Sequence, residues 1–413
     1  MGAVIEHLEV KGIQIPLIYE QNKLLPTTNI QIVFRQSGSI EDGKMPGLAS
    51  LSARILNEGT RKKGSLEFAK ELESNAISLS VSSGLETLSF DLSALSSEMQ
   101  RGVSLLGELL RDPNLTKEAL LKVKAQAHAS LLRKESDFDT IASQTLQKLL
   151  FEGTPLAEPS SGTISSIQAI GLKAIKQFLS DHMTLSRAIV LVASNLSTQE
   201  VKEEIARALS ILPTEVLPPQ KQFETSALAR EHRVQKATKQ AYVYFGAPFY
   251  IVSIEQQSAK AKVASFVLGG SGFGSRIMEE VRVKRGLAYS ASMRLNIGVT
   301  QCYASGHLQT KLENEQEAIA LVKEVVREFV EKGITQKELD SAKQFLLGSE
   351  PLRNETANQR LSSAFSNYYK GLSLDYSKQE LERIQALGLV EVNEYIMAHT
   401  EILSLSFGIV ADQ

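Results

Sequence analysis

The sequence predicts an α+β protein made of two tandem homologous domains, each a mainly antiparallel sheet packed with helices. Three observations lead to this fold class. The chain has 413 residues, which is enough for more than one domain of typical size. A motif recurs at long spacing, and strand-like and helix-like segments occur in both halves. Segregated strands and amphipathic helices in each half argue against a doubly wound α/β fold.

The repeat is carried first by a six-residue motif. Residues 167–172 read IQAIGL, and residues 384–389 read IQALGL, 217 positions later. Each copy is followed by a helix-like stretch, a histidine (His182 or His399) and an apolar strand. Because the two histidines hold the same place in both copies, we expect them to have a structural role at a helix end.

A second match lies at nearly the same spacing. Thr116 and Thr335 each precede a helix-like segment, and Lys124 and Lys343 follow them at equal distances. Thr335 also has the spacing of a capping box with Glu338. Matches at offsets of 217 and 219 residues predict two units of about 200 residues each rather than a short-period solenoid.

Individual elements follow from the spacing of apolar residues. In the first half, apolar residues alternate over 77–81 and 88–92, which predicts two half-buried strands. Over 99–110 they recur at helical spacing, which predicts an amphipathic helix.

The second half repeats this style. Residues 242–245 are strand-like, and residues 287–295 with 301–308 are predicted to form a hairpin. A long helix is predicted over 313–332, and Gly333 is expected to end it.

The domain boundaries follow from a change in pattern near the middle of the chain. We expect an N-terminal domain over 1–215, a linker over 216–233 and a C-terminal domain over 234–413. The linker prediction depends on Pro218 and Pro219, which lie among polar residues without a sustained period.

Bulk composition excludes several classes of protein. The chain is 43% hydrophobic and 22% charged with a net charge of −2, which gives no sign of a nucleic-acid partner. No apolar run approaches the roughly 20 residues that span a bilayer. Cys302 is the single cysteine, so an intrachain disulfide and a cysteine-based zinc site are excluded. No signal peptide is evident, as would also be true of a mature exported chain whose signal was removed. Because the chain starts abruptly at its first strand, we expect a soluble, bacterial periplasmic or secreted protein rather than a cytoplasmic one.

The most distinctive segment is VRVKRGLAYS at 281–290, which places Arg282 and Tyr289 seven residues apart across a helix-to-strand turn. By spacing alone, Arg282 would be a charged residue on the surface of a helix, and Tyr289 would be a tyrosine packed at the edge of a sheet. With the duplication and the GLASLSARILNEGT segment at 47–60, however, the block at 269–290 resembles the pitrilysin/insulinase family of zinc metallopeptidases. The similarity covers essentially the whole chain, favours the processing-peptidase-like branch and implies a LuxS-metalloenzyme or processing-peptidase type of fold.

In active members of that family the first motif is His-x-x-Glu-His on a helix. Positions i and i+4 share a helix face, so two imidazoles can bind one zinc ion while the glutamate activates a bound water. Here the matching positions are Ser50, Ala53 and Arg54, and the further ligand glutamate matches Leu131, 77 residues after Arg54. The resemblance therefore implies that this chain holds no metal or other cofactor, with zinc expected in a partner subunit.

The second motif is retained, and the resemblance assigns it a role. Arg282 and Tyr289 would hold the substrate carbonyl and stabilise the oxyanion, since both side chains offer hydrogen-bond donors. The leading hypothesis is a zinc-free subunit of a heterodimeric metallopeptidase that is inactive alone. Its partner would be a homologous subunit carrying His-x-x-Glu-His, and its substrates peptides or unfolded polypeptides.

Other functions stay open or fit poorly. A non-catalytic scaffold or assembly subunit of the same fold is the main alternative. A third hypothesis is a self-sufficient peptidase with a different active site, but the chain has no Cys/His or Ser/His/Asp signature to support it. The glycine-rich segment 269–274 lacks the Gly-Lys-Ser/Thr ending of a phosphate loop and follows a helix-like segment. The resemblance implies instead that this turn lets the next helix begin tightly.

Overall fold

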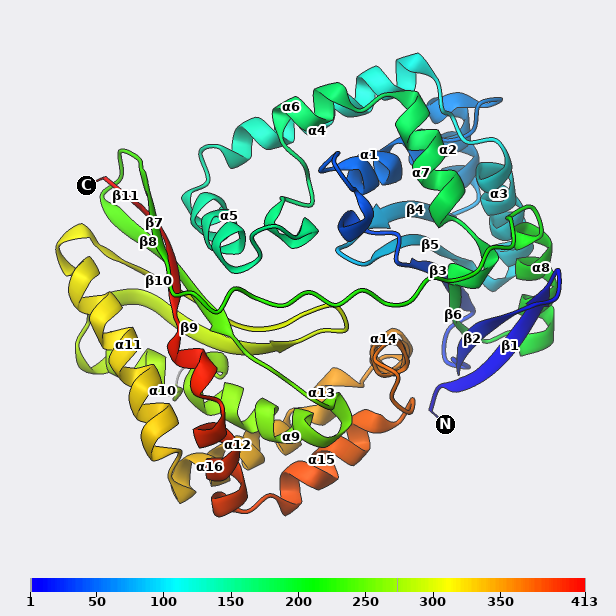
Figure 1. The fold of residues 1–413 in the computed structure, drawn as a ribbon. Helices are drawn as coiled ribbons and strands as arrows, with labels where there is room; N and C mark the ends of the chain where they lie inside the picture. Colours follow the sequence, from blue (N-terminus) through cyan, green and yellow to red (C-terminus); the bar gives the residue numbers. More distant parts are fainter. Residues whose placement is uncertain (1, 273, 413) are drawn as a thin grey trace.

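The protein is described by a computed structural model covering residues 2–272 and 274–412. Two halves, each with its own sheet and helices, are joined by an extended segment that passes between them (Figure 1). Phe273, part of the glycine-rich segment singled out in the sequence, lies outside the described residues. Each half has a large hydrophobic core of its own.

The sheet of the N-terminal half has six strands. Its order is β1-β2-β6-β3-β5-β4. β2 and β6 run parallel, and the other neighbours run antiparallel. The strands are β1 (Val4–Val10), β2 (Ile13–Gln21), β3 (Thr27–Arg35), β4 (Ser78–Ser83), β5 (Thr87–Leu95) and β6 (Ala188–Ser194).

The sheet of the C-terminal half repeats five of these strands in the same order, β7-β11-β8-β10-β9. β7 and β11 run parallel, as β2 and β6 do, and the other neighbours run antiparallel. This shared topology confirms the duplication predicted from the sequence. The strands are β7 (Glu231–Gln235), β8 (Gln240–Pro248), β9 (Ala288–Ile297), β10 (Cys302–Lys311) and β11 (Ser406–Ala411).

Helices fill the space around both sheets, and the segments predicted as helices are helical. In the N-terminal half they are α1 (Leu48–Leu56), α2 (Gly64–Ser74), α3 (Met99–Arg111), α4 (Lys117–Lys134), α5 (Phe138–Leu150), α6 (Ile164–Ala169), α7 (Leu172–His182) and α8 (Thr198–Leu209). In the C-terminal half they are α9 (Ile254–Ser265), α10 (Arg276–Met278), α11 (Glu315–Lys332), α12 (Gln336–Gly348), α13 (Glu350–Arg353), α14 (Ala357–Tyr369), α15 (Tyr376–Ala386) and α16 (Leu389–Ala398).

The repeated sequence matches correspond to repeated contacts. Lys124 on α4 donates to the carbonyl of Gln168 at 2.8 Å, and Lys343 on α12 donates to the carbonyl of Gln385 at 2.9 Å. Both glutamines belong to the IQA motif. Thr335 begins α12 with the predicted capping box. The two motifs and two lysines seen in the sequence are therefore parts of one duplicated helix–helix contact.

The repeated histidines also occupy equivalent places. His182 is the last residue of α7, and His399 is the C-cap of α16. The His182 ring bonds the Phe178 carbonyl one turn earlier, at 2.8 Å. Both histidines therefore lie at a helix end, as expected from their place in the repeat.

The two halves exchange a helix. α5, from the N-terminal half, lies against β8 and β11 of the second sheet (Figure 1). It approaches so closely that a Cβ on Gly408 would lie 2.5 Å from the Leu146 nitrogen, and one on Gly246 would lie 2.9 Å from the Leu150 side chain. Only glycine leaves room for a helix at this distance.

In return, α14 of the C-terminal half packs on β2 and β6 of the first sheet. Leu361 and Ala364 of α14 form a small apolar cluster with Ile18 and its neighbours. Beside it, the Arg360 guanidinium donates to the fully buried Glu20 carboxylate at 2.8 Å. The exchange ties the halves together through both apolar and charged contacts.

The segment predicted as a linker is extended, with one correction. Residues 213–230 contain no helix or strand, but β7 begins at Glu231, inside the predicted range 216–233. β7 forms because it pairs in parallel with β11, where Glu231 lies opposite Phe407. That partner is far away in the sequence, so local composition could not reveal the strand. Across residues 2–272 and 274–412, no helix combines the length and apolarity needed to cross a membrane.

Candidate functional site

The start of α1, the helix that carries the first motif, is fixed by a buried carboxylate. Asp42 accepts the backbone N–H groups of Gly47 at 2.6 Å and Ala49 at 2.7 Å. Gly47 has a left-handed φ of 90°, and a Cβ there would lie 2.9 Å from the Gly162 Cα. Burial raises the pKa of Asp42 to about 7, although the N–H groups favour the ionised form.

The positions that match the zinc motif do not form a metal site. Every residue of α1 is buried except Ser50 and Arg54, which lie one turn apart on its more exposed stripe. Ala53 is only 3% exposed, and Leu131 on α4 is 8% exposed, and both belong to the same hydrophobic core. A hydroxyl, a methyl group, a guanidinium and an aliphatic chain cannot provide the nitrogen and carboxylate ligands of a zinc site.

Arg54 has a structural explanation in this position. It lies in the last turn of α1, where a cation interacts favourably with the carbonyl end of the helix. Among residues 2–272 and 274–412, no three His, Cys, Asp or Glu side chains are grouped so that they could hold a metal ion. The residues present at these positions therefore do not fit the zinc ion that His-x-x-Glu-His binds in active members of the family.

The second motif forms a defined pair in the C-terminal half. Arg282 lies in the π-helical segment η6 (Glu279–Lys284), and Tyr289 lies in β9. The guanidinium carbon is 5.5 Å from the centroid of the tyrosine ring, which is the geometry of a cation–π contact. Tyr289 is 76% exposed, and β9 is the edge strand of its sheet. Tyr289 is therefore exposed at the edge of its sheet, beside the half-buried Arg282 side chain.

The turn between these two residues explains the Arg-Gly-Leu part of the motif. Gly286 has a left-handed φ of 61°, and its N–H donates to the Arg282 carbonyl at 3.0 Å. The Leu287 N–H reaches back to the Val281 carbonyl at 2.9 Å. Each of these bonds spans one residue more than in a Schellman motif, in agreement with the π-helical η6, and the left-handed turn favours glycine because other residues are strained there. It directs the chain from η6 straight into β9.

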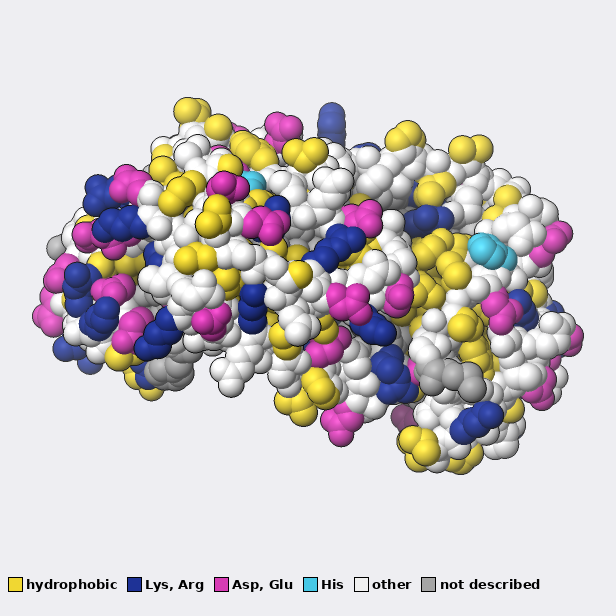
Figure 2. Space-filling model, turned by 90° about the horizontal axis from the view of Figure 1, so that it is seen from below, with side chains coloured by type: hydrophobic (Ala, Val, Ile, Leu, Met, Phe, Trp, Pro, Cys, Tyr) yellow, Lys and Arg dark blue, Asp and Glu magenta, His cyan; other side chains and the backbone are white. Residues whose placement is uncertain are grey.

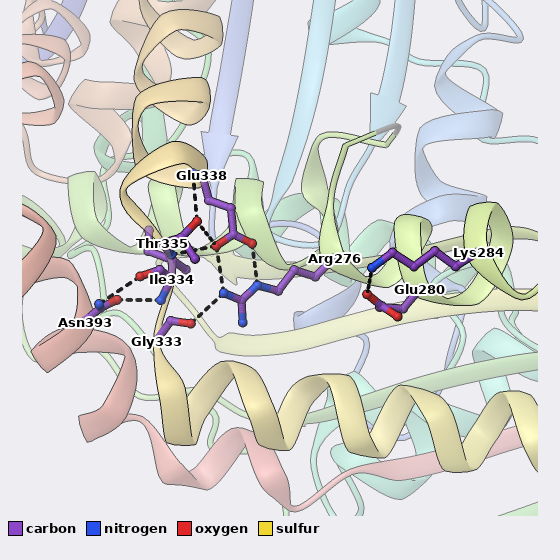
Figure 3. Close-up of polar contacts among 8 residues, drawn as sticks. All are labelled: Arg276, Glu280, Lys284, Gly333, Ile334, Thr335, Glu338 and Asn393. Atoms are coloured by element: carbon purple, nitrogen blue, oxygen red, sulfur yellow. Dashed lines mark hydrogen bonds and ion pairs between the residues drawn. The ribbon is translucent and has the colours of Figure 1, made fainter.

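The segment that carries Arg282 is anchored by a neighbouring arginine (Figure 3). Arg276 donates to the Glu338 carboxylate through Nε at 2.6 Å and Nη2 at 2.8 Å, and to the Gly333 carbonyl at 2.7 Å. Glu338 also accepts the Thr335 N–H at 2.7 Å, as part of the capping box. Burial alone would raise the pKa of Glu338, but the hydrogen bonds from Arg276 and Thr335 hold it below its usual value.

This clamp is only partly visible in the sequence. The capping-box spacing singles out Glu338, but nothing in the local pattern points to Arg276, which lies 62 residues earlier. Bidentate arginine–carboxylate pairs are well oriented as well as strong, so the clamp fixes the start of the helical segment that contains Arg282 and ends at Lys284.

The glycine-rich turn has a packing role. Gly269 lies in the π-helical turn η5 (Phe266–Gly270), where a Cβ would come within 2.3 Å of the Met293 nitrogen on β9. Glycine therefore allows this turn to contact the strand backbone directly. The contact gives a structural reason for the first glycines of the segment without a phosphate ligand.

Two family descriptions match successive parts of the chain. Residues 17–164 match Insulinase (Peptidase family M16), and residues 169–346 match Peptidase M16 inactive domain. The chain belongs to the M16 insulinase family. Membership confirms the pitrilysin/insulinase resemblance drawn from the motifs, and the inactive-domain description agrees with the predicted non-zinc branch.

Curated relatives match this M16 chain over most of their length. The Helicobacter pylori protein "Non-peptidase homolog YmxG" is 46% identical over 412 residues, which cover 100% of this chain and 95% of the relative. The Bacillus subtilis protein "Uncharacterized zinc protease YmxG" is 24% identical over 396 residues, 91% of each chain.

Solved M16 structures show the same fold. A peptidase M16 inactive domain from Pseudomonas fluorescens has a TM-score of 0.89 at 23% identity, covering 99% of this chain and 98% of that one. The Escherichia coli periplasmic protease PqqL has a TM-score of 0.77 at 13% identity, covering 100% of this chain but only 47% of PqqL. The M16 chain thus spans about half of PqqL.

Proposed function

We propose that this chain is a zinc-free subunit of a two-subunit M16 metallopeptidase. In this proposal Arg282 and Tyr289 bind the substrate carbonyl and stabilise the oxyanion, while a homologous subunit with His-x-x-Glu-His supplies the metal. The chain itself would carry no cofactor and would be inactive alone. Its substrates would be peptides or unfolded polypeptides.

The observation that carries the proposal is the contrast between the two motifs. The metal-ligand positions are replaced by residues that cannot bind zinc, and two of them lie in the core. The Arg282–Tyr289 pair, by contrast, is assembled at 5.5 Å on an edge strand, with the tyrosine exposed. A purely structural pair has no need of exposure, whereas a substrate-binding pair does.

The position on an edge strand supports a peptide as the ligand. β9 ends its sheet, and Gly269 and Ser265 cover its outer edge at Met293 and Leu295, so the edge proposed to bind a peptide is the stretch around Tyr289. An extended peptide can add to such an edge through main-chain hydrogen bonds. The length of PqqL, about twice the span matched here, is also in keeping with a working unit of two such pieces.

The test is cleavage of a quenched-fluorescent peptide mixture by the purified chain, alone and with a co-expressed His-x-x-Glu-His relative from the same genome. We expect no peptide cleavage by the chain alone and chelator-sensitive cleavage by the pair of subunits. In the pair, Arg282→Ala should lower turnover by about 10²–10³, the usual cost of losing an oxyanion donor, and leave assembly intact.

Arg285→Ala is the matched control, because Arg285 is an exposed neighbour whose nearest carboxylate partner, Glu280, is 4.0 Å away. Tyr289→Phe should lower turnover while keeping the ring contact with Arg282. An Arg282→Ala pair that cleaves at the wild-type rate would exclude the proposed role. Chelator-sensitive cleavage by the chain alone would place a metal site elsewhere in this sequence.

The second candidate is a non-catalytic scaffold of the same fold. It is favoured by the name of the Helicobacter pylori relative, "Non-peptidase homolog YmxG", which is 46% identical over the whole chain. A stable complex with the zinc-bearing relative that shows no turnover of any peptide would support the scaffold. The Arg282–Tyr289 pair, with its exposed tyrosine, is the feature that a scaffold leaves unexplained.

A further inference from the structure

The C-terminal half contains a cavity of about 480 Å³ that includes neither Arg282 nor Tyr289 in its lining. Its walls come from α9, η5, β9, α12, α13, α14 and α15. In the order of elements, α9 and α12 hold the places that α1 and α4 hold in the N-terminal half. A volume in this range suits a small ligand or the end of a peptide.

Four cations line this cavity, namely Lys262, Arg294, Arg353 and Lys370. Lys262 is neutralised by Glu380, whose carboxylate lies 2.7 Å from its ammonium. Among the described residues, the other three form no ion pair with any carboxylate within 4.0 Å. On the molecular face shown in Figure 2, by contrast, basic and acidic side chains are interspersed. The cavity therefore has a local positive excess of three charges.

The polar groups of the walls are occupied with one another and do not balance these cations. The Ser258 hydroxyl bonds the Tyr376 hydroxyl at 2.8 Å, and Tyr376 donates to the Glu255 carbonyl at 2.7 Å. Asn367, which is 7% exposed, donates to the Leu374 carbonyl at 3.1 Å. These bonds hold α9, α14 and α15 in place, so the cavity has fixed walls and a cationic lining.

The rest of the lining is apolar. Phe266 and Phe345 lie with ring centroids 5.0 Å apart, and Leu295 and Leu346 continue the same wall. An apolar surface beside unpaired cations is suited to a ligand with an apolar body and an anionic end. Arginine binds carboxylates in a planar two-bond geometry, which favours a carboxylate as that end.

We propose that this cavity binds a carboxylate carried on an apolar body. The carboxylate is held by Arg353, Lys370 and Arg294, and the apolar body lies against the phenylalanine wall. The C-terminus of a peptide with a hydrophobic last residue has this chemistry, and so does a short fatty acid. The proposal goes beyond the role of Arg282 and Tyr289 and does not depend on it.

The experiment is calorimetric titration of the purified full-length chain with four probes. They are N-acetyl-Ala-Ala-Phe with a free carboxylate, the same peptide as a C-terminal amide, octanoate and inorganic phosphate. We expect the peptide carboxylate to bind about tenfold or more tightly than the amide, because the amide cannot form charge-assisted bonds. Phosphate should bind more weakly than the peptide carboxylate, since it lacks an apolar body.

The variant Arg353→Gln/Lys370→Gln should abolish the preference for the carboxylate over the amide. Arg61→Gln, an exposed arginine of the N-terminal half, is the control that should leave it unchanged. If the double variant also loses affinity for octanoate, a fatty acid is supported as the natural source of the carboxylate. If octanoate binds the wild type and the double variant equally, the peptide is supported.

Several results would overturn the proposal. They are equal binding of carboxylate and amide by the wild-type chain, phosphate binding as tight as that of the peptide, and absence of binding at millimolar concentration. Unchanged affinity in a folded double variant would also overturn it. If circular dichroism shows that the double variant does not fold, the proposal is tested by comparing the affinities of the wild-type chain for the peptide carboxylate and the peptide amide.

Discussion

The two halves share one order of elements but fill equivalent space in opposite ways. In the N-terminal half, α1 and α4 meet in a core that includes Ala53 and Leu131. In the C-terminal half, α9 and α12 border a cavity of about 480 Å³ with three unpaired cations. A duplicated backbone therefore does not preserve a site, because the side chains at equivalent places decide whether the space is closed or open.

The exchanged helices differ in a similar way. α5 approaches the second sheet over Gly246 and Gly408, and Tyr244 of β8 donates to the exposed Asp139 carboxylate of α5 at 3.2 Å. α14 is fixed on the first sheet partly by the ion pair between Arg360 and the buried Glu20. The α5 interface therefore combines close packing with an exposed polar contact, whereas the α14 interface contains a fully buried charge.

The largest expected effect tests whether the α1 site is closed. Ala53→Glu places a carboxylate in the core, so we expect it to lower the free energy of unfolding by about 3–5 kcal/mol. Ser50→Glu, on the more exposed stripe of the same helix, should cost less than about 1 kcal/mol. Urea unfolding measures both. Equal losses of unfolding free energy would mean that the core around Ala53 can open to admit a carboxylate, so that the N-terminal half would not be closed at this place.

The next effect tests the charged interface of the exchange. Arg360→Met leaves the Glu20 carboxylate buried without its partner, and we expect a loss of about 3 kcal/mol. Glu20→Gln/Arg360→Met should recover part of that loss, because no buried charge remains. Thermal and urea unfolding of the three proteins give the comparison. A single variant as stable as the double variant would show that Glu20 does not depend on Arg360.

One carboxyl group in each half should also contribute to stability with the opposite dependence on pH. The pKa of Asp42 is raised to about 7 in the folded chain, above its ordinary value of 3.8. Between these values the folded state keeps a proton that the unfolded state has released, so stability from this group falls as pH rises from about 4 to about 7. The pKa of Glu338 is lowered, so its contribution is present above pH 4.5 and is lost as pH falls.

Unfolding free energies measured from pH 4 to 8 for the wild type, Asp42→Asn and Glu338→Gln test these signs. We expect the wild type minus the Asp42 variant to decline with rising pH, by a few kcal/mol at most. The difference for the Glu338 variant should instead grow as the pH is raised from 4. Parallel profiles for both variants would contradict the assignment of opposite shifts.

The smallest effect concerns the repeated lysine contact. Lys343 donates to two carbonyls, those of Gln385 at 2.9 Å and Leu387 at 2.6 Å, whereas Lys124 donates to Gln168. Lys343→Met should therefore cost about 1 kcal/mol and Lys124→Met about half as much. Thermal unfolding with matched methionine variants measures the difference. A larger loss for Lys124 would mean that the two contacts are not equivalent in the way the repeat indicates.

The sequence by itself determined the repeat, the helix boundaries and the loss of the metal ligands. These features are local: the capping box at Thr335, the glycine at 286 and the replacement of ligands at Ser50, Ala53 and Arg54 can be read within a few residues of each other. Apolar periodicity likewise acts within a single element, so the strands near 77–81 and 88–92 and the helix over 99–110 could be predicted without their partners.

The tertiary structure alone decided the rest. Arg276 and Glu338 meet across 62 residues, and the strand at Glu231 exists because β11 lies beside it. The cations of the cavity come from separate elements, so no spacing in the sequence joins them. Whether equivalent space is filled or open depends on side chains brought together by the whole fold, because packing and charge pairing act between neighbours in space and not between neighbours in the chain.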